Sequence, residues 1–421
     1  MRPTDGRSTA VLVGLASVGS AAVSYVVTLL GTRSLGSVSE TTQFLTFTSI
    51  VFTAYGVLGG LSSELTRAHA TAEQLDRRRG PRTSVAALCV ALLGGTAMAV
   101  AWPVWSHLLV HPEGRLVALL PLAVVLYVGH AALVGATAGD RLWRLCSTTI
   151  ALEAALRLLA TALVCVVGAT IFGLGAATAL GALAWLVLIC LSPTARRAMS
   201  QRLDHAAARM TARIVASMTA QGASAVLVVG FPVLLSATTP AHDYLSSAPL
   251  ILAVTLTRAP LLIPLNAYQG VVVSTFIHRG GKLAVSRRVA VLIFLAVLAI
   301  VLAAGLVGPF VLELLFGSAY RSTGSLLALL TIGAVLLALL TFSGSLCQAL
   351  DRHRWFLSGW VVAVVVAVAV LNIPGAMDSR AVAALLLGPA AGLAVHAIFL
   401  SRSAAVQRGS KPIDEESRDR L

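Results

Sequence analysis

The sequence predicts an all-α polytopic membrane protein with about twelve transmembrane helices, arranged as two six-helix lobes around a central cavity. Composition is the first reason: of 421 residues, 57% are hydrophobic and 11% are charged, and the mean hydropathy is +0.89. No water-soluble globule of this length has that composition. The second reason is that apolar runs near the ~20 residues needed to cross a bilayer recur from end to end. The distribution of charge is the third.

Each expected span is an apolar run bounded by polar or glycine-containing segments. In chain order the runs cover residues 9–30, 41–64, 84–108, 116–138, 146–167, 170–191, 214–236, 247–277, 289–316, 323–347, 357–373 and 381–401. Between the ninth and tenth runs, "LLFGSAYRS" is expected to form a turn outside the membrane. Gly317 can end the helix before it, and Tyr320 suits the membrane–water interface.

The net charge of +14 is distributed in a way that sets the orientation. If the N-terminus is cytoplasmic, nearly all Lys and Arg residues fall in cytoplasmic segments. The exceptions are Arg33, Arg115, Arg321 and Arg380 outside, and Arg157 and Arg258 within spans. This asymmetry predicts that both termini lie in the cytoplasm. Anionic membrane lipids are therefore the expected partners of the basic residues, and nucleic acid is not.

A polar joint in the middle of the chain suggests the domain organisation. We predict an N-terminal lobe over residues 1–195, a basic cytoplasmic linker helix over 196–213, a C-terminal lobe over 214–401 and a polar tail over 402–421. Residues 26–52 and 228–254 share the pattern of a span, an outside turn and a second span. Such similarity indicates an internal repeat, as in many transporters with a central site.

Enzyme and cofactor motifs are absent from the sequence. It contains no GxSxG, Walker A or HExxH motif, and the first outside loop, "GTRSLGSVSE", lacks an acidic pair of the kind a membrane glycosyltransferase uses. The 5 cysteines lie within or at the ends of spans without CxxC spacing. We therefore predict that the protein is not an enzyme and holds no metal or other cofactor.

Arg258 is the clearest candidate for a binding residue. A charge near the middle of a bilayer costs roughly 2.5–3.5 kcal/mol on insertion scales, and its span contains no acidic residue to offset this. Pro260 and Pro264 follow and can bend the helix, and Asn266 and Gln269 add polar groups. A cavity-facing arginine suits a phosphate or pyrophosphate.

Glu153 and Arg157 form a second candidate pair within a span. They lie four residues apart with the glutamate first, the favourable order for an ion pair on one helix face. The pair either neutralises itself structurally or faces the cavity and opens when an anionic ligand arrives. The alternative for Arg258 is likewise structural: pairing with Glu153 or with a backbone carbonyl group.

Further charged candidates lie near the ends of spans. Glu64 and Arg67 close the second span at the inner surface, either as a structural interface pair or as part of a gate. Arg33, in the first outside turn, is a further cavity or gate candidate.

Several motifs resemble the Wzx-type polysaccharide flippases of the multidrug/oligosaccharidyl-lipid/polysaccharide (MOP) exporter superfamily. "TLLGTRSLGSVSE" is similar to their first outside turn, with Arg33, Leu35 and Gly36 matching an Arg-x-Leu-Gly segment. "YGVLGGLSSELTRAHA" is similar to their glycine-rich second helix, which ends in an arginine, here Arg67. "LELLFGSAYRSTGSLLALL", followed by the polar "ALDRHRW", carries the strongest resemblance.

The resemblance implies two lobes in a V and movement of an undecaprenyl-pyrophosphate-linked glycan between the leaflets of a bacterial inner membrane. A polysaccharide polymerase or glycosyltransferases would then be possible partners. The alternatives are an ion-coupled drug exporter of the same superfamily, a major facilitator transporter suggested by "LDRRRGPR", and a non-transporting partner in polysaccharide assembly.

Overall fold

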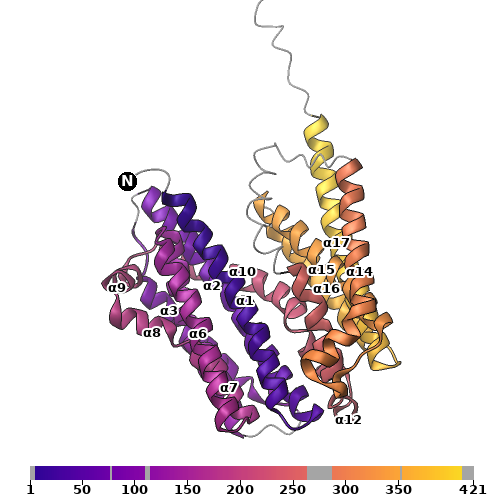
Figure 1. The fold of residues 1–421 in the computed structure, drawn as a ribbon. Helices are drawn as coiled ribbons and strands as arrows, with labels where there is room; N and C mark the ends of the chain where they lie inside the picture. Colours follow the sequence, from indigo (N-terminus) through magenta and orange to yellow (C-terminus); the bar gives the residue numbers. More distant parts are fainter. Residues whose placement is uncertain (1–4, 76–77, 110–113, 263–286, 351–352, 410–421) are drawn as a thin grey trace, which may run out of the picture.

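The computed structural model describes residues 5–75, 78–109, 114–262, 287–350 and 353–409, and these form helices joined by turns (Figure 1). The first half of the chain contains α1 (Asp5–Ser34), α2 (Val38–Gln74), α3 (Thr83–Val100), α4 (Trp102–Ser106), α5 (Gly114–Gly139), α6 (Trp143–Val167), α7 (Ile171–Gly181), α8 (Ala184–Leu191) and α9 (Pro193–Ser200).

The second half begins with a broken helix and ends with long ones. It contains α10 (Ala207–Val228), α11 (Phe231–Thr238), α12 (Ala241–Tyr244), the helix Ala248–Leu262, α14 (Arg287–Phe316), the 3-10 turn η1 (Ser318–Tyr320), α15 (Gly324–Ala349), α16 (His353–Leu371) and α17 (Met377–Gly409).

The predicted fold class is confirmed. In the described part of the chain, 10 helices are long and apolar enough to cross a membrane, or up to 11 when the bent pair α10 and α11 is one span. They match the predicted runs in order. The eighth predicted run begins with the helix Ala248–Leu262 and continues into residues outside the described part.

Local sequence explains where several helices begin and end. At the start of α2, the Ser37 hydroxyl accepts a hydrogen bond from the Glu40 amide at 3.2 Å, and the Glu40 carboxylate accepts one from the Gly36 amide at 3.0 Å. This reciprocal arrangement resembles a capping box and satisfies backbone donors that the helix leaves unpaired. After α14, Gly317 adopts φ 104°, which glycine tolerates without strain, so the predicted turn is present.

The helices divide into two groups that meet along α2 and α10. Figure 1 shows α1–α9 on one side and α14–α17 on the other, with α10 between them. Glycines allow α2 and α10 to approach closely: a Cβ atom on Gly60 would lie 2.5 Å from the Met218 backbone, and one on Gly56 would lie 2.5 Å from the Ala225 side chain. The boundaries of the two predicted lobes remain a prediction.

The linker predicted as one basic helix over 196–213 is interrupted. Helix α9 ends at Ser200, and α10 begins at Ala207. Between them the chain pairs with the loop before α3: the Gly80 amide donates to the Leu203 carbonyl at 2.7 Å, and the Leu203 amide donates to the Pro81 carbonyl at 3.0 Å. These backbone groups form hydrogen bonds with the loop before α3 and not within a helix. The segment is therefore extended, although its composition predicted a helix.

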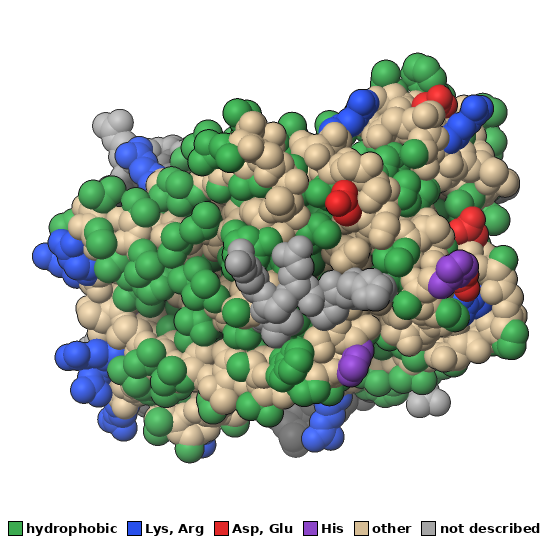
Figure 2. Space-filling model, turned by 90° about the horizontal axis from the view of Figure 1, so that it is seen from below, with side chains coloured by type: hydrophobic (Ala, Val, Ile, Leu, Met, Phe, Trp, Pro, Cys, Tyr) green, Lys and Arg blue, Asp and Glu red, His purple; other side chains and the backbone are tan. Residues whose placement is uncertain are grey.

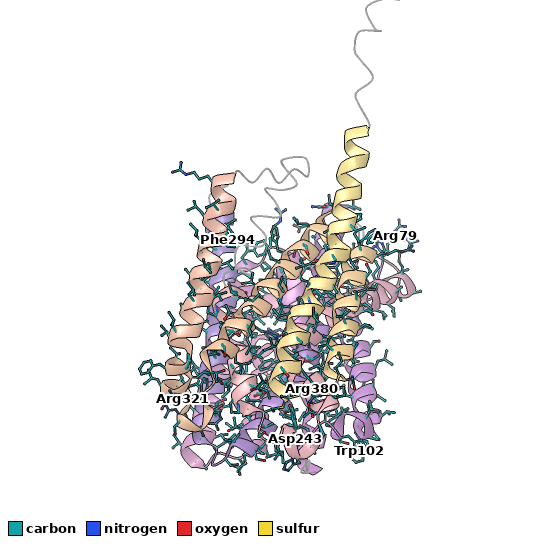
Figure 3. All side chains as sticks on the ribbon, turned by 90° about the vertical axis from the view of Figure 1, so that its right-hand side faces the viewer. Arg79, Trp102, Asp243, Phe294, Arg321 and Arg380 are labelled. Carbon is teal, nitrogen blue, oxygen red and sulfur yellow. The ribbon has the colours of Figure 1, made fainter. Side chains whose placement is uncertain are left out.

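The residues predicted on opposite sides of the membrane lie at opposite ends of the molecule. Figure 3 shows Arg79 near one end and Trp102, Asp243, Arg321 and Arg380 near the other. Figure 2 looks at the second end, where the surface is mostly hydrophobic and neutral with scattered charges. We call this the outer end, following the predicted orientation.

Candidate substrate-binding cavity

A cavity of about 1040 Å³ lies between the two groups of helices. Its walls come from α1, α2, α5, α6, α10, α11, the helix Ala248–Leu262, α15 and α16. On α1 the lining runs from Thr28 back to Val13, and on α15 it runs from Thr341 to Gln348. Both stretches lead away from the outer end, so the cavity extends from the middle of the molecule towards the inner end.

Arg258 lines this cavity and has two kinds of contact. Its Nη1 donates to the carbonyl oxygens of Leu227 at 3.1 Å and Val228 at 2.8 Å, and its Cζ lies 5.7 Å from the centre of the Phe231 ring. Its buried Nη2 has no hydrogen-bond partner among the described residues. Arg258 therefore has a structural contact through Nη1, and as a residue that lines the cavity it remains a candidate for ligand binding.

A break in the seventh span explains why those carbonyl groups are available. Helix α10 ends at Val228 and α11 begins at Phe231, with a bend of 69° between them. The last carbonyl groups of a helix lack donors from its own backbone, and in a membrane they must find others. Arg258 provides such donors, and the cation also suits the negative end of the helix dipole.

Glu153 and Arg157 line the same cavity from α6. Arg157 Nη2 lies 3.5 Å from Glu153 Oε2, and both side chains are buried. Arg157 Cζ also lies 5.2 Å from the centre of the Phe52 ring. The Nε–H group of Arg157 has no hydrogen-bond partner in the described structure. The ion pair with Glu153 therefore leaves one donor of Arg157 unsatisfied.

Aromatic residues beside this pair were missed in the sequence. Tyr55 and Tyr127 line the cavity, and their rings stack with centroids 3.6 Å apart. The Tyr127 ring in turn stacks on His130 at 5.0 Å, and the buried Tyr55 hydroxyl lacks a partner among the described atoms. Tyrosines within otherwise apolar spans were the available signal, since a buried hydroxyl needs a partner or a polar cavity.

Glu64 and Arg67 lie outside the lining of the cavity. Glu64 Oε1 accepts hydrogen bonds from Arg67 Nη2 at 2.6 Å and from Arg213 Nε at 2.7 Å. Arg67 Nη1 also donates to Asp204 Oδ2 at 3.0 Å. The network joins α2 to the linker and to α10. Asp204 and Arg213 were missed because separation in sequence concealed their proximity.

Arg33 likewise lies outside the cavity lining, at the outer end. Its guanidinium group donates to the carbonyl groups of Leu314 and Leu315 in the last turn of α14. It therefore joins the first span to the ninth. The other predicted cavity residues, Asn266 and Gln269, lie outside the described residues.

Hydrogen bonds between distant segments close the outer end. Thr41 Oγ1 lies 2.8 Å from the Tyr320 hydroxyl oxygen, and Thr46 Oγ1 lies 2.6 Å from that of Tyr244. The Thr42 hydroxyl donates to the Leu245 carbonyl at 3.0 Å. These contacts connect α2 with the second half of the chain at the outer end, whereas the cavity extends towards the inner end.

Solved structures with the same fold are membrane transporters. A multidrug resistance MATE family transporter of the MOP superfamily, in an inward-facing conformation, superposes with a TM-score of 0.66 at 16% identity, covering 92% of this chain and 96% of its own. A MOP superfamily transporter from Pyrococcus furiosus, described as having a binding pocket of reverse polarity, superposes with a TM-score of 0.65 at 16% identity, covering 94% and 96%.

Curated sequences include much nearer relatives. Uncharacterized protein Rv1510 of Mycobacterium tuberculosis is 39% identical over 404 residues, which cover 94% of this chain and 92% of that protein. Uncharacterized protein Mb3654 of Mycobacterium bovis is 35% identical over 402 residues, covering 93% and 91%. No family model matches the chain. The chain therefore has the fold of the MATE transporters and belongs to the same family as these mycobacterial proteins.

Proposed function

We propose that the protein is a flippase that moves an undecaprenyl-pyrophosphate-linked glycan from the inner to the outer leaflet of a bacterial cell membrane by alternating access. The proposal is carried by Arg258, which lines the cavity and whose buried Nη2 has no hydrogen-bond partner among the described residues. A guanidinium nitrogen in a site of low dielectric constant forms strong, charge-assisted hydrogen bonds to phosphate oxygens.

The fold gives this site a means of reaching both sides of the membrane. The similar solved transporters include an inward-facing structure, with a TM-score of 0.66, and an outward-facing one, with a TM-score of 0.62. A cavity of about 1040 Å³ that is closed at one end suits a bound head group in one of two such states. No covalent chemistry is needed, because the substrate changes only its leaflet.

Arg258→Ala tests the role of the site in transport. We would reconstitute purified protein in liposomes with a fluorescent prenyl-pyrophosphate-linked glycan and measure the rate at which the label becomes accessible to a quencher. Loss of a charge-assisted contact predicts a rate lower by about tenfold or more. Arg258→Lys, which keeps the charge, should retain an intermediate rate.

Arg380→Ala is a matched control for this experiment. Arg380 Nη1 also donates to backbone carbonyls, those of Thr238 at 3.1 Å and Leu371 at 2.7 Å, but it does not line the cavity. Both arginines donate to carbonyl groups at helix ends, so either substitution can lower the amount of folded protein. Each transport rate is therefore divided by the amount of folded protein. If Arg258→Ala transports at the wild-type rate, the pyrophosphate site is elsewhere.

An ion-coupled drug exporter is the second candidate, and Glu153 favours it. This carboxylate lines the cavity beside Arg157. None of the other described residues that line the cavity is acidic. In that case a Glu153→Gln variant would lose ion-driven efflux of a lipophilic cation while keeping glycan accessibility unchanged. The flippase hypothesis predicts that Arg258→Ala affects glycan movement and that no ion-driven drug efflux is found in the wild type.

A further inference from the structure

We propose that one wall of the cavity, formed by α1 and by hydroxyl groups facing the cavity from α2, α15 and the helix Ala248–Leu262, binds the hydroxyl groups of a saccharide. The inference rests on the proposed function and extends it: Arg258 would bind the phosphate, and this wall would recognise the sugar attached to it.

The α1 part of the wall is a ladder of hydroxyl groups. Ser17, Ser20, Ser24 and Thr28 follow one another at intervals of three or four residues, which places them on one helix face, and all of them line the cavity. Ser17 is exposed, the other three residues are partly buried, and only 6% of the most apolar window of this span is buried. The ladder is therefore not a packing seam between helices.

Most hydroxyl hydrogen atoms of this ladder are donated to backbone carbonyl groups of α1. The hydroxyl groups donate to the carbonyl four residues earlier: Ser17 to Val13 at 2.8 Å, Ser24 to Ser20 at 3.0 Å and Thr28 to Ser24 at 2.9 Å. A hydroxyl group has one hydrogen and two acceptor lone pairs. These oxygens can thus act towards the cavity as hydrogen-bond acceptors.

The other helices that contribute to this wall repeat the same pattern. The hydroxyl groups of Thr48 on α2, Thr255 on the helix Ala248–Leu262 and Thr341 on α15 line the cavity and donate to their own helices at 2.9, 2.8 and 2.9 Å. Hydroxyl acceptors consequently line the cavity from each of these helices. A ligand rich in hydrogen-bond donors complements such a lining.

The donor and acceptor parts belong to the same cavity. Tyr25, which follows Ser24 in the chain, lines it together with Arg258. A phosphate-linked sugar has the complementary order, with an acceptor phosphate joined to a ring carrying several hydroxyl donors. A quaternary ammonium drug offers neither group, since it has no N–H donor and no negative charge.

The test compares binding of farnesyl pyrophosphate, farnesyl-pyrophosphoryl-glucose and farnesol to the purified full chain in detergent. We expect the glucose-linked probe to bind about tenfold tighter than farnesyl pyrophosphate, because several hydrogen bonds of modest strength are added. Combined substitution Ser17→Ala, Ser20→Ala and Ser24→Ala should remove that advantage and leave the affinity for farnesyl pyrophosphate within about twofold. Alanine favours the helix, so folding is preserved.

The control variant combines Ser63→Ala and Thr148→Ala. These hydroxyl groups donate to their own helices at 3.0 and 2.8 Å but do not line the cavity, so the glucose advantage should persist. The inference is overturned if the triple variant keeps the advantage, or if glucose adds nothing in the wild type. The proposed function fails separately if farnesyl pyrophosphate binds no tighter than farnesol and Arg258→Gln has no effect.

Discussion

At the scale of single residues, four arginines cap helix ends. Arg258 donates to the last carbonyls of α10, Arg196 to those of Ile189 and Cys190 in α8, and Arg33 to those near the end of α14. Arg380 donates to the last residues of both α11 and α16. Terminal carbonyls lack donors from their own helices, and cations favour that end of the dipole. Arg258 differs from the other three arginines because it lines the cavity.

The ion pair of Glu153 and Arg157 provides a prediction about stability. Glu153→Gln should lower the free energy of unfolding by on the order of 3 kcal/mol, because it leaves Arg157 buried without an anion. Combining it with Arg157→Gln should recover most of that loss. Thermal unfolding of the two single variants and the double variant in detergent gives the coupling free energy between the Glu153 and Arg157 side chains. Additive losses would show that the two side chains do not neutralise one another.

At the scale of elements, the break between α10 and α11 shapes the site. It supplies the carbonyls that hold Arg258, and it brings Val229 close enough for its carbonyl to accept a hydrogen bond from Ser49 of α2 at 2.6 Å. The broken span is thus tied both to α2 and to the helix that carries Arg258. A helix broken at membrane depth is tolerated where its free backbone groups find partners beside a cavity.

The close packing of α2 on α10 gives a prediction at neighbouring positions. Gly60→Ala should lower the free energy of unfolding by about 1–3 kcal/mol, because the added Cβ meets the α10 backbone. Gly59→Ala, where no atom lies within 4 Å of the added Cβ, should raise it by about 0.5–1 kcal/mol through helix propensity. Denaturant or thermal unfolding measures both. Equal effects of the two substitutions would contradict the close approach.

The sequence patterns predicted the positions of the helices well, but they predicted the contacts between the helices less well. Apolar runs and flanking glycines gave the spans, because burial in lipid imposes length and composition on each helix by itself. The break at residues 229–230 was missed, although Pro232 in "GFPVLL" indicates a helix start. Arg258, Glu153 and Arg157 do line the cavity, whereas Arg33, Glu64 and Arg67 do not. Which face of a helix meets a cavity depends on tertiary packing, which a local pattern does not contain.

At the scale of the whole molecule, the two ends differ. Threonine and tyrosine hydroxyl groups join α2 to the second half of the chain at the outer end, while the cavity extends towards the inner end. In the proposed transport cycle this closure opens, which breaks these neutral hydrogen bonds, each contributing only about 0.5–1.5 kcal/mol net, and the contacts of Arg33 with α14. In the proposed alternating-access cycle, this closure separates when the inner end closes.

Locking the outer end should therefore stop transport without abolishing binding. We would place Thr41→Cys and Tyr320→Cys in a background without the 5 native cysteines and join them with a short bifunctional thiol reagent. Because the cavity extends away from this contact, farnesyl pyrophosphate should bind the cross-linked protein with the affinity of the untreated one. The rate of leaflet exchange should fall by about tenfold or more, since opening is blocked. Each single cysteine variant, treated with the same reagent, should keep its rate. Exchange at an undiminished rate after complete cross-linking would mean that this end does not open during transport.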